Sequence, residues 1–168
     1  MIGFDFKTTN RILFGSGTIV ELPNIAGEFG SRALLVCSSR RNAGEDLQRR
    51  LDERGIVVTN FQVSGEPTLE QIMDGVKIAR DIEAQFLIGF GGGSVLDTAK
   101  AVAALATNPG EVLDYLEVIG NGRPLEIDPI PVIAVPTTAG TGSEVTRNAV
   151  LGVKAEGIKV SLRSPKML

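Results

Sequence analysis

Two segments of the sequence combine glycine with hydroxyl side chains: GGGS at residues 91–94 and TTAGTGS at residues 137–143. The first segment follows an apolar run and opens a stretch with helical spacing. Backbone amides at the start of a helix suit a pyrophosphate, because the helix dipole is positive there and glycine holds no side chain in the way. The alternative is a tight turn from strand to helix, for which one glycine with positive φ suffices. Three consecutive glycines exceed that need, so we favour phosphate binding.

The second segment offers hydroxyl groups on a backbone kept thin by alanine and glycine. Hydroxyls donate and accept hydrogen bonds, which suits ribose, amide or adenine edges. The alternative is a connection whose Ser and Thr side chains bond their own backbone. Because both segments follow apolar runs, and ligands of open parallel sheets bind beyond the carboxyl ends of the strands, the pair favours a nucleotide. The spacing differs from the G-x-G-x-x-G fingerprint and no Gly-Lys-Ser/Thr occurs, which disfavours an ordinary Rossmann site and a P-loop kinase.

The elements that position these segments alternate between strands and helices. Short apolar runs predict strands at residues 33–37, 56–59, 86–90 and 131–135. Apolar spacing predicts helices at residues 19–30, 43–54, 94–106 and 111–116, and another that begins with a capping box of Thr68 and Gln71. We therefore expect an α/β fold with a parallel, doubly wound sheet.

Two hairpins are predicted beside this sheet. Residues 149–153 and 158–162 form one, around Glu156 and Gly157. Near the N-terminus, Phe4, Phe6, Ile12 and Phe14 alternate with polar residues, which predicts a hairpin or paired edge strands around residues 8–11.

The composition sets limits on the chemistry. The 168 residues have the length of one domain, and the absence of histidine excludes Ser-His-Asp and Cys-His sites, His-ligated zinc and a His general base. Seventeen Lys and Arg against 20 Asp and Glu give a net charge of −3, which argues against nucleic acid. The single cysteine, Cys37, fits a reducing compartment, and the sequence begins without a signal-peptide pattern and holds no apolar run of membrane-spanning length. We expect a soluble cytoplasmic protein.

The two glycine-rich segments belong to longer motifs, GGGSVLDTAK at residues 91–100 and PTTAGTGSEVT at residues 136–146. These resemble the two signature segments of iron-containing (group III) alcohol dehydrogenases, and residues 14–15, 114–116, 159–161 and 164–165 fit the same family pattern. The resemblance implies the N-terminal, nucleotide-binding domain of a two-domain NAD(P)-dependent oxidoreductase. Its Rossmann-like fold would be related to those of glycerol dehydrogenase and dehydroquinate synthase.

The resemblance also implies roles for individual residues. Gly92, Gly93 and Ser94 would meet the pyrophosphate, and Asp97 would lie near the nicotinamide side. Three threonines would line the adenosine side and Lys159 would approach the ribose; the threonines are Thr137, Thr138 and Thr141. The alternatives are that Asp97 is a helix-surface charge and Lys159 a solvated hairpin residue.

The family holds its metal, Fe²⁺ or Zn²⁺, with an Asp and three His residues of a following all-helical domain. Since the sequence contains no histidine, we expect residues 1–168 to be a dinucleotide-binding domain that ends before the metal-binding domain. The family uses the metal to polarise the alcohol oxygen, as a Lewis acid does. This chain is therefore expected to bind the cofactor but no metal, and to turn over no alcohol by itself.

One departure from the family pattern concerns the choice of cofactor. Members that prefer NAD commonly carry Asp directly after the first strand, whereas this chain has Ser38, followed by Ser39, Arg40 and Arg41. Small hydroxyls with nearby guanidinium groups suit a 2′-phosphate, which a carboxylate would repel, so we predict a preference for NADP, with NAD possible. The alternative is that Arg40 and Arg41 face solvent. Glu66, where many relatives have Asn, slightly weakens the NADP prediction.

The function predicted from the family resemblance is metal-assisted hydride transfer between alcohols and aldehydes or ketones, with this chain as the cofactor-binding half. Two alternatives remain open: a sister activity such as that of maleylacetate reductase, and a stand-alone nucleotide-binding module without catalysis. The family also implies a homodimer paired through the N-terminal strands. Cys37 is disfavoured as a nucleophile because no histidine is available to activate it, and Glu144 is interpreted as a structural hydrogen-bond acceptor.

Overall fold

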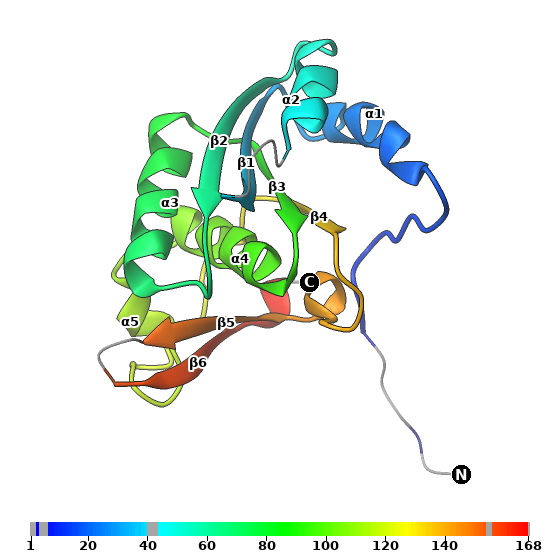
Figure 1. The fold of residues 1–168 in the computed structure, drawn as a ribbon. Coiled ribbons are helices and arrows are strands. Elements are labelled where there is room, and N and C mark those ends of the chain that lie inside the picture. Colours follow the sequence, from blue (N-terminus) through cyan, green and yellow to red (C-terminus); the bar gives the residue numbers. More distant parts are fainter. Residues whose placement is uncertain (1–2, 4–6, 40–43, 154–155, 168) are drawn as a thin grey trace.

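The fold was taken from a computed structural model of the chain, in which residues 3, 7–39, 44–153 and 156–167 are described (Figure 1). Four strands form a parallel sheet in the order β2-β1-β3-β4. They are β1 (Arg32–Ser38), β2 (Val57–Val63), β3 (Phe86–Gly91) and β4 (Val132–Pro136). An antiparallel hairpin of β5 (Asn148–Val153) and β6 (Ile158–Arg163) lies beside this sheet. The hairpin confirms the prediction for residues 149–162.

Five α-helices occur within the described residues: α1 (Leu22–Gly27), α2 (Glu45–Asp52), α3 (Leu69–Asp81), α4 (Gly93–Thr107) and α5 (Val112–Tyr115). Short 3₁₀ helices are η1 (Thr18–Glu21), η2 (Ser143–Val145) and η3 (Pro165–Met167). Helix α3 begins with the predicted capping box, in which Thr68 Oγ1 accepts from the Gln71 amide at 3.3 Å and the Thr68 amide donates to Gln71 Oε1 at 3.2 Å. Its Gly75 allows close packing on α4, because a Cβ there would lie 2.6 Å from Val102 Cγ2.

The helices cover both faces of the sheet. Along β1, Leu34 and Val36 join the apolar cluster that includes residues of α3 and α4, while Ala33 and Leu35 join the cluster that includes residues of α1 and α2. A strand buried on both faces needs an uninterrupted apolar run, which explains the sequence at residues 33–37. The doubly wound, Rossmann-like α/β fold is confirmed.

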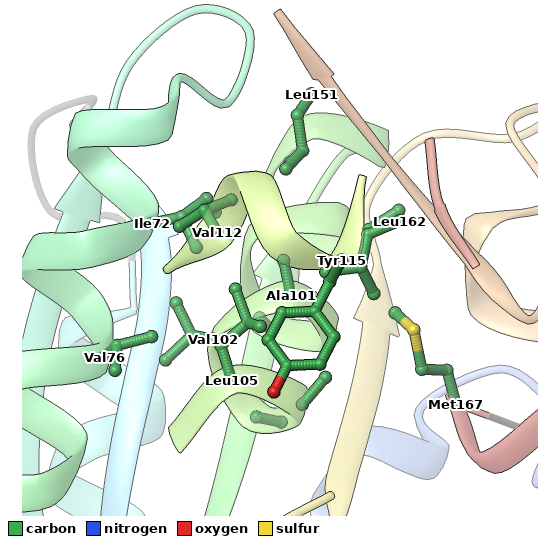
Figure 2. Packing of buried hydrophobic residues seen from close by; sticks show 14 of the residues in the cluster. Ile72, Val76, Ala101, Val102, Leu105, Val112, Tyr115, Leu151, Leu162 and Met167 are labelled. Carbon is green, nitrogen blue, oxygen red and sulfur yellow. The ribbon is translucent and has the colours of Figure 1, made fainter. Parts of the chain in front are cut away.

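The larger apolar cluster also joins the hairpin to the helices. Figure 2 shows Ile72 and Val76 of α3 beside Val102 of α4 and Val112 of α5. Leu151 of β5 and Leu162 of β6 belong to the same cluster. The hairpin is therefore held by buried apolar contacts and lies in a fixed position relative to α4.

The strand order places the reversal of the winding between β1 and β3. The chain passes from β1 outward to β2 and then returns to β3 on the other side of β1. In such sheets ligands bind at the carboxyl ends of the two strands between which the winding reverses. Here those ends are Ser38 of β1 and Gly91 of β3.

Three expectations need correction. Phe4 and Phe6 lie outside the described residues, and residues 7–14 of the predicted N-terminal hairpin contain no strand. Ile12 and Phe14 are 62% and 97% exposed, and alternation without a paired strand does not stabilise a β-structure. The strand predicted at residues 56–59 extends to Val63, since polar residues are tolerated at a sheet edge. The strand predicted at residues 131–135 to be buried is only half-buried, because β4 forms the other edge of the sheet.

Candidate functional site

The GGGS turn joins the end of β3 to the start of α4. Gly92 is the N-cap of this 15-residue helix, and the helix has neither a side-chain cap nor an acidic residue in its first turn. The first amides of a helix have no acceptor within the helix and lie at the positive end of its dipole. This end of α4 therefore presents donors and partial positive charge to an anion.

The turn requires glycine at its first three positions because neighbouring atoms leave little room for a side chain, and not because the backbone conformation is strained. None of Gly91, Gly92 and Gly93 has a positive φ, so the alternative of a single turn glycine does not apply to them. A Cβ on Gly91 would lie 2.6 Å from Val95 Cγ2. Positive φ values occur instead in the second turn, at Gly140 (94°) and Gly142 (66°).

The second turn lies directly against the first. A Cβ on Gly92 would come within 3.2 Å of Thr138 Oγ1, and one on Gly93 within 3.2 Å of Thr141 Cγ2. The Thr137 amide donates to the Gly91 carbonyl at 2.9 Å. All three threonines are exposed. The structure thus brings together the two segments that the sequence analysis singled out.

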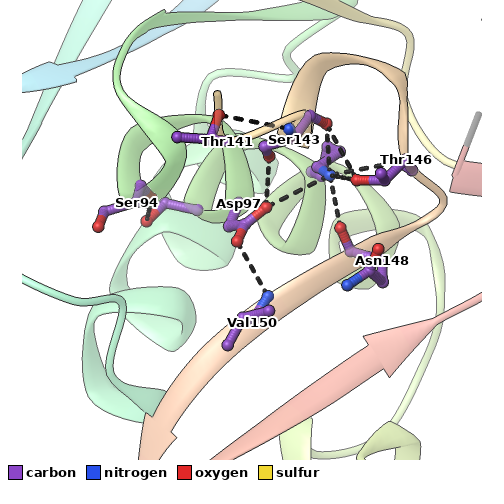
Figure 3. Close-up of polar contacts among 9 residues, drawn as sticks. Ser94, Asp97, Thr141, Ser143, Thr146, Asn148 and Val150 are labelled. Atoms are coloured by element: carbon purple, nitrogen blue, oxygen red, sulfur yellow. Dashed lines mark hydrogen bonds and ion pairs between the residues drawn. The ribbon is translucent and has the colours of Figure 1, made fainter. Parts of the chain in front are cut away.

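Asp97 of α4 connects the helix to the second turn and to the hairpin (Figure 3). Its Oδ1 accepts from Ser143 Oγ at 2.5 Å and its Oδ2 accepts from the Val150 amide at 3.1 Å. The side chain is only 14% exposed, so the alternative of a helix-surface charge is wrong. Its contact with a nicotinamide ring stays a prediction.

Lys100 is a site residue to which the sequence analysis gave no role. Its ammonium Nζ donates to the carbonyl oxygens of Ser143 at 2.7 Å and Asn148 at 2.5 Å, and lies 3.3 Å from Asp97 Oδ1. The side chain is 7% exposed. The signal in the sequence was the spacing of Asp97 and Lys100, because residues three apart share a helix face.

Electrostatics around Lys100 involve two carboxylates. Burial lowers the pKa of the Lys100 ammonium, and the charges of Asp97 and Glu144 offset part of this effect. Glu144 Oε2 is buried and has no hydrogen-bond donor among the described residues. The interpretation of Glu144 as a hydrogen-bond acceptor is therefore wrong for this oxygen, which instead contributes charge near Lys100.

The other residues predicted to bind the cofactor are Ser38, Arg40 and Lys159. Ser38 is partly buried at the end of β1, opposite Val63 of β2. Lys159 of β6 is exposed and forms an ion pair with Glu66, which agrees with the alternative of a solvated hairpin residue. No described contact joins it to Ser38, and its approach to the ribose stays a prediction. Arg40 and Arg41 lie outside the described residues.

Cys37 precedes Ser38 in β1 and is 1% exposed. Burial raises the pKa of its thiol. Both effects oppose nucleophilic reactivity, in line with the interpretation made from the sequence.

A family model described as iron-containing alcohol dehydrogenase matches residues 9–168 of the chain. The chain belongs to the iron-containing alcohol dehydrogenase family. Long-chain-alcohol dehydrogenase 1 of Geobacillus thermodenitrificans is 49% identical over 145 residues, which are 83% of this chain and 36% of that protein.

Two solved structures extend the similarity to the fold. That of 1,3-propanediol oxidoreductase superposes with a TM-score of 0.88 at 30% identity, covering 99% of this chain and 44% of the other. That of sulfoacetaldehyde reductase from Bifidobacterium kashiwanohense, in complex with NAD⁺, gives 0.86 at 29% identity, covering 100% of this chain and 45% of the other. The chain thus spans less than half the length of these relatives.

The family is named for iron, but the described residues of this chain do not form a metal-binding site. They contain no group of three or more His, Cys, Asp or Glu side chains placed to hold a metal ion. The sequence as a whole has no histidine. The location of the family's metal ligands outside this chain stays a prediction. In the same described ranges, no helix has both the length and the apolar character needed to cross a membrane.

Proposed function

We propose that this chain binds a nicotinamide dinucleotide where its two glycine-rich turns meet, and forms the cofactor-binding half of an alcohol dehydrogenase. The observation that carries the proposal is the contact of the turns, with Thr138 packed over Gly92 and Thr141 over Gly93. A side chain on either glycine would fill the space between the uncapped start of α4 and the threonine hydroxyls. Both turns lie at the sheet edge where doubly wound folds bind ligands.

In this proposal the chain's own groups hold and orient the cofactor. The first amides of α4, with Ser94, receive the pyrophosphate. The hydroxyls of Thr137, Thr138 and Thr141 serve the adenosine side, as the family resemblance implies. The Asp97–Lys100 pair holds the second turn in place. The dinucleotide held by these residues would supply the nicotinamide that accepts a hydride from an alcohol carbon or donates one to a carbonyl carbon. The sulfoacetaldehyde reductase of Bifidobacterium kashiwanohense, a structural relative, was solved in complex with NAD⁺, which supports a nicotinamide dinucleotide as the ligand.

We also propose a preference for NADP over NAD. Ser38 leaves room at the end of β1 where a carboxylate would repel a 2′-phosphate, and Arg40 follows two residues later. A charge-assisted hydrogen bond contributes about 1.5–3 kcal/mol, so Arg40→Ala should weaken NADP⁺ binding by about tenfold to a hundredfold while NAD⁺ binding changes little. Equal affinities of the unmodified chain for NADP⁺ and NAD⁺ would contradict this preference.

Isothermal titration of the 168-residue chain with NADP⁺, NAD⁺ and ATP tests the proposal. We expect one site per chain that takes NADP⁺ most tightly and ATP most weakly, since ATP has no second nucleoside to bridge the turns. Tightest binding of ATP would indicate a general nucleotide module instead. Failure to bind any of the three would remove the proposal.

The complete reaction depends on groups that we place outside this chain. We propose that an all-helical domain supplies the Fe²⁺ or Zn²⁺ ligands, and that the substrate is a small alcohol, aldehyde or ketone. The cytoplasm as the site of action and the homodimer stay predictions. This proposal can be tested by joining the chain to the helical domain of a relative and measuring metal-dependent alcohol oxidation. Activity would show that this chain can supply the cofactor site while the helical domain supplies the metal site.

A further inference from the structure

Two lysines lie near the proposed cofactor edge, and the structure holds them very differently. Lys100 is buried and donates to backbone carbonyls. Lys159 is 62% exposed, and its described partner is the carboxylate of Glu66, itself 56% exposed. An exposed ion pair contributes little to stability and exchanges partners easily. Lys159 is therefore the lysine that a ligand could recruit.

Strand pairing and a short stretch of chain connect Ser38 to the Glu66–Lys159 ion pair. Ser38 lies opposite Val63 in the β1–β2 register, and the Ser39 amide donates to the Val63 carbonyl at 2.9 Å. Glu66 follows three residues after Val63, a span of at most about 10 Å of extended chain. Figure 1 shows β2 running into the loop that leads to the start of α3, next to β5.

A backbone hydrogen bond joins the β5–β6 hairpin to the loop between β2 and α3, at the residue of β5 that pairs with Lys159. The Gly152 amide donates to the Pro67 carbonyl at 2.7 Å, and Gly152 is paired with Lys159 across β5 and β6. The Cβ position of Gly152 lies 3.6 Å from Glu66 Oε2. Lys159 and Glu66 are thus held together by backbone contacts and not only by their opposite charges.

We propose that Glu66 is a specificity residue, which limits the affinity for the 2′-phosphate of NADP by neutralising Lys159. This inference rests on the proposed function and identifies a determinant within that site. A 2′-phosphate meets a lysine that attracts it and a glutamate that repels it, and as a pair their charges cancel. NAD lacks this phosphate, so the pair has little effect on NAD.

Four variants of the full chain, each titrated with NADP⁺ and NAD⁺, test the inference. They are Glu66→Gln, Lys159→Met, the double variant, and Glu117→Gln as a matched control. Glu117 pairs with Arg163 at the other end of β6, with side-chain exposures of 43% and 50% and a distance of 3.8 Å. Circular dichroism spectra establish that each variant is folded.

Glu66→Gln should tighten NADP⁺ binding by about twofold to fivefold, the effect of one exposed charge contact, and leave NAD⁺ binding essentially unchanged. Lys159→Met alone should weaken NADP⁺ binding by a similar factor, because it leaves the Glu66 carboxylate without its counter-charge and free to repel the 2′-phosphate. In the Glu66→Gln background the same change should remove the whole gain. The gain should also shrink at high salt, and Glu117→Gln should reproduce none of it.

Three results would overturn the inference: no gain in Glu66→Gln, an equal gain for NAD⁺, or a gain that persists in the double variant. The last would mean that Glu66 repels phosphate directly and that Lys159 takes no part. Each leaves the proposed function intact, because the unmodified chain still binds a dinucleotide. Failure of the unmodified chain to bind either dinucleotide would overturn both.

Discussion

The ammonium of Lys100 lies 2.7 Å from the carbonyl oxygen of Ser143, joining the helix that begins with the first turn to the segment that ends the second. The same ammonium reaches the Asn148 carbonyl in β5 at 2.5 Å, and Asp97 accompanies it on the helix. The relative position of the two turns is thus set by a buried charged pair. A dinucleotide that spans both turns depends on that position.

Replacing Lys100 by Met should destabilise the chain strongly. The change leaves the Asp97 carboxylate without its counter-charge and removes a donor from buried carbonyls, which typically costs about 3–5 kcal/mol. Urea unfolding followed by circular dichroism measures the loss. Lys77→Met, at an exposed lysine of α3, is the control and should stay within about 0.5 kcal/mol of the parent. Similar stabilities for both variants would refute a structural role of the Lys100 contacts.

A methyl group on Gly93 should impair cofactor binding more than folding. Its Cβ would lie 3.2 Å from Thr141 Cγ2, between the start of α4 and the second turn. We expect dinucleotide affinity to fall by at least about tenfold, or about 1.4 kcal/mol. Gly27→Ala is the matched control, because nothing lies within 4 Å of its Cβ position. Calorimetric titration of the two variants with NADP⁺ compares them, and unchanged affinity in Gly93→Ala would count against the site.

The Cys37 thiol should be unreactive in the folded chain. Burial leaves it 1% exposed and raises its pKa above the ordinary value of 9.0. Because the folded-state pKa is the higher one, the thiol's contribution to stability is fully present below pH 9.0 and is lost as the pH rises through the folded-state value. Reaction with a chromogenic disulfide at pH 8 should proceed only after urea is added. Rapid modification of the native chain would show that β1 opens readily.

The isolated chain should not oxidise alcohols. Its sequence lacks histidine, and the described ranges contain no cluster of metal-ligating side chains. Incubation with a small primary alcohol, NADP⁺ and added Fe²⁺ or Zn²⁺ should therefore produce no NADPH absorbance. Metal-dependent turnover by the purified chain would show that it carries a catalytic centre of its own.

Local patterns of the sequence predicted most of the fold. The apolar runs at residues 33–37 and 86–90 predicted the two central strands, because strands buried on both faces admit few polar residues. The capping box predicted the start of α3, since it depends only on Thr68 and Gln71. The N-terminal alternation failed, because a strand also needs a partner that no local pattern specifies.

The candidate site was predictable in part for the same reason. Its two turns are local motifs that follow predicted strands. The burial of Lys100 and the Glu66–Lys159 ion pair depend on which side chains meet across the folded chain. The spacing of Asp97 and Lys100 indicates only that they share a helix face. No local pattern specifies which segment covers that face or which side chain Lys159 meets, so the positions of both lysines required the structure.

The most direct test of a single dinucleotide site at the junction of the turns is an NMR titration of the ¹⁵N-labelled chain of 17.8 kDa with NADP⁺. We predict that the amides of residues 92–95 and 137–142 shift together and saturate with one dissociation constant. The amide signals of residues near Glu117, beside the far end of β6, should keep their chemical shifts. Shifts confined to one turn, or unequal saturation of the two, would contradict a shared site.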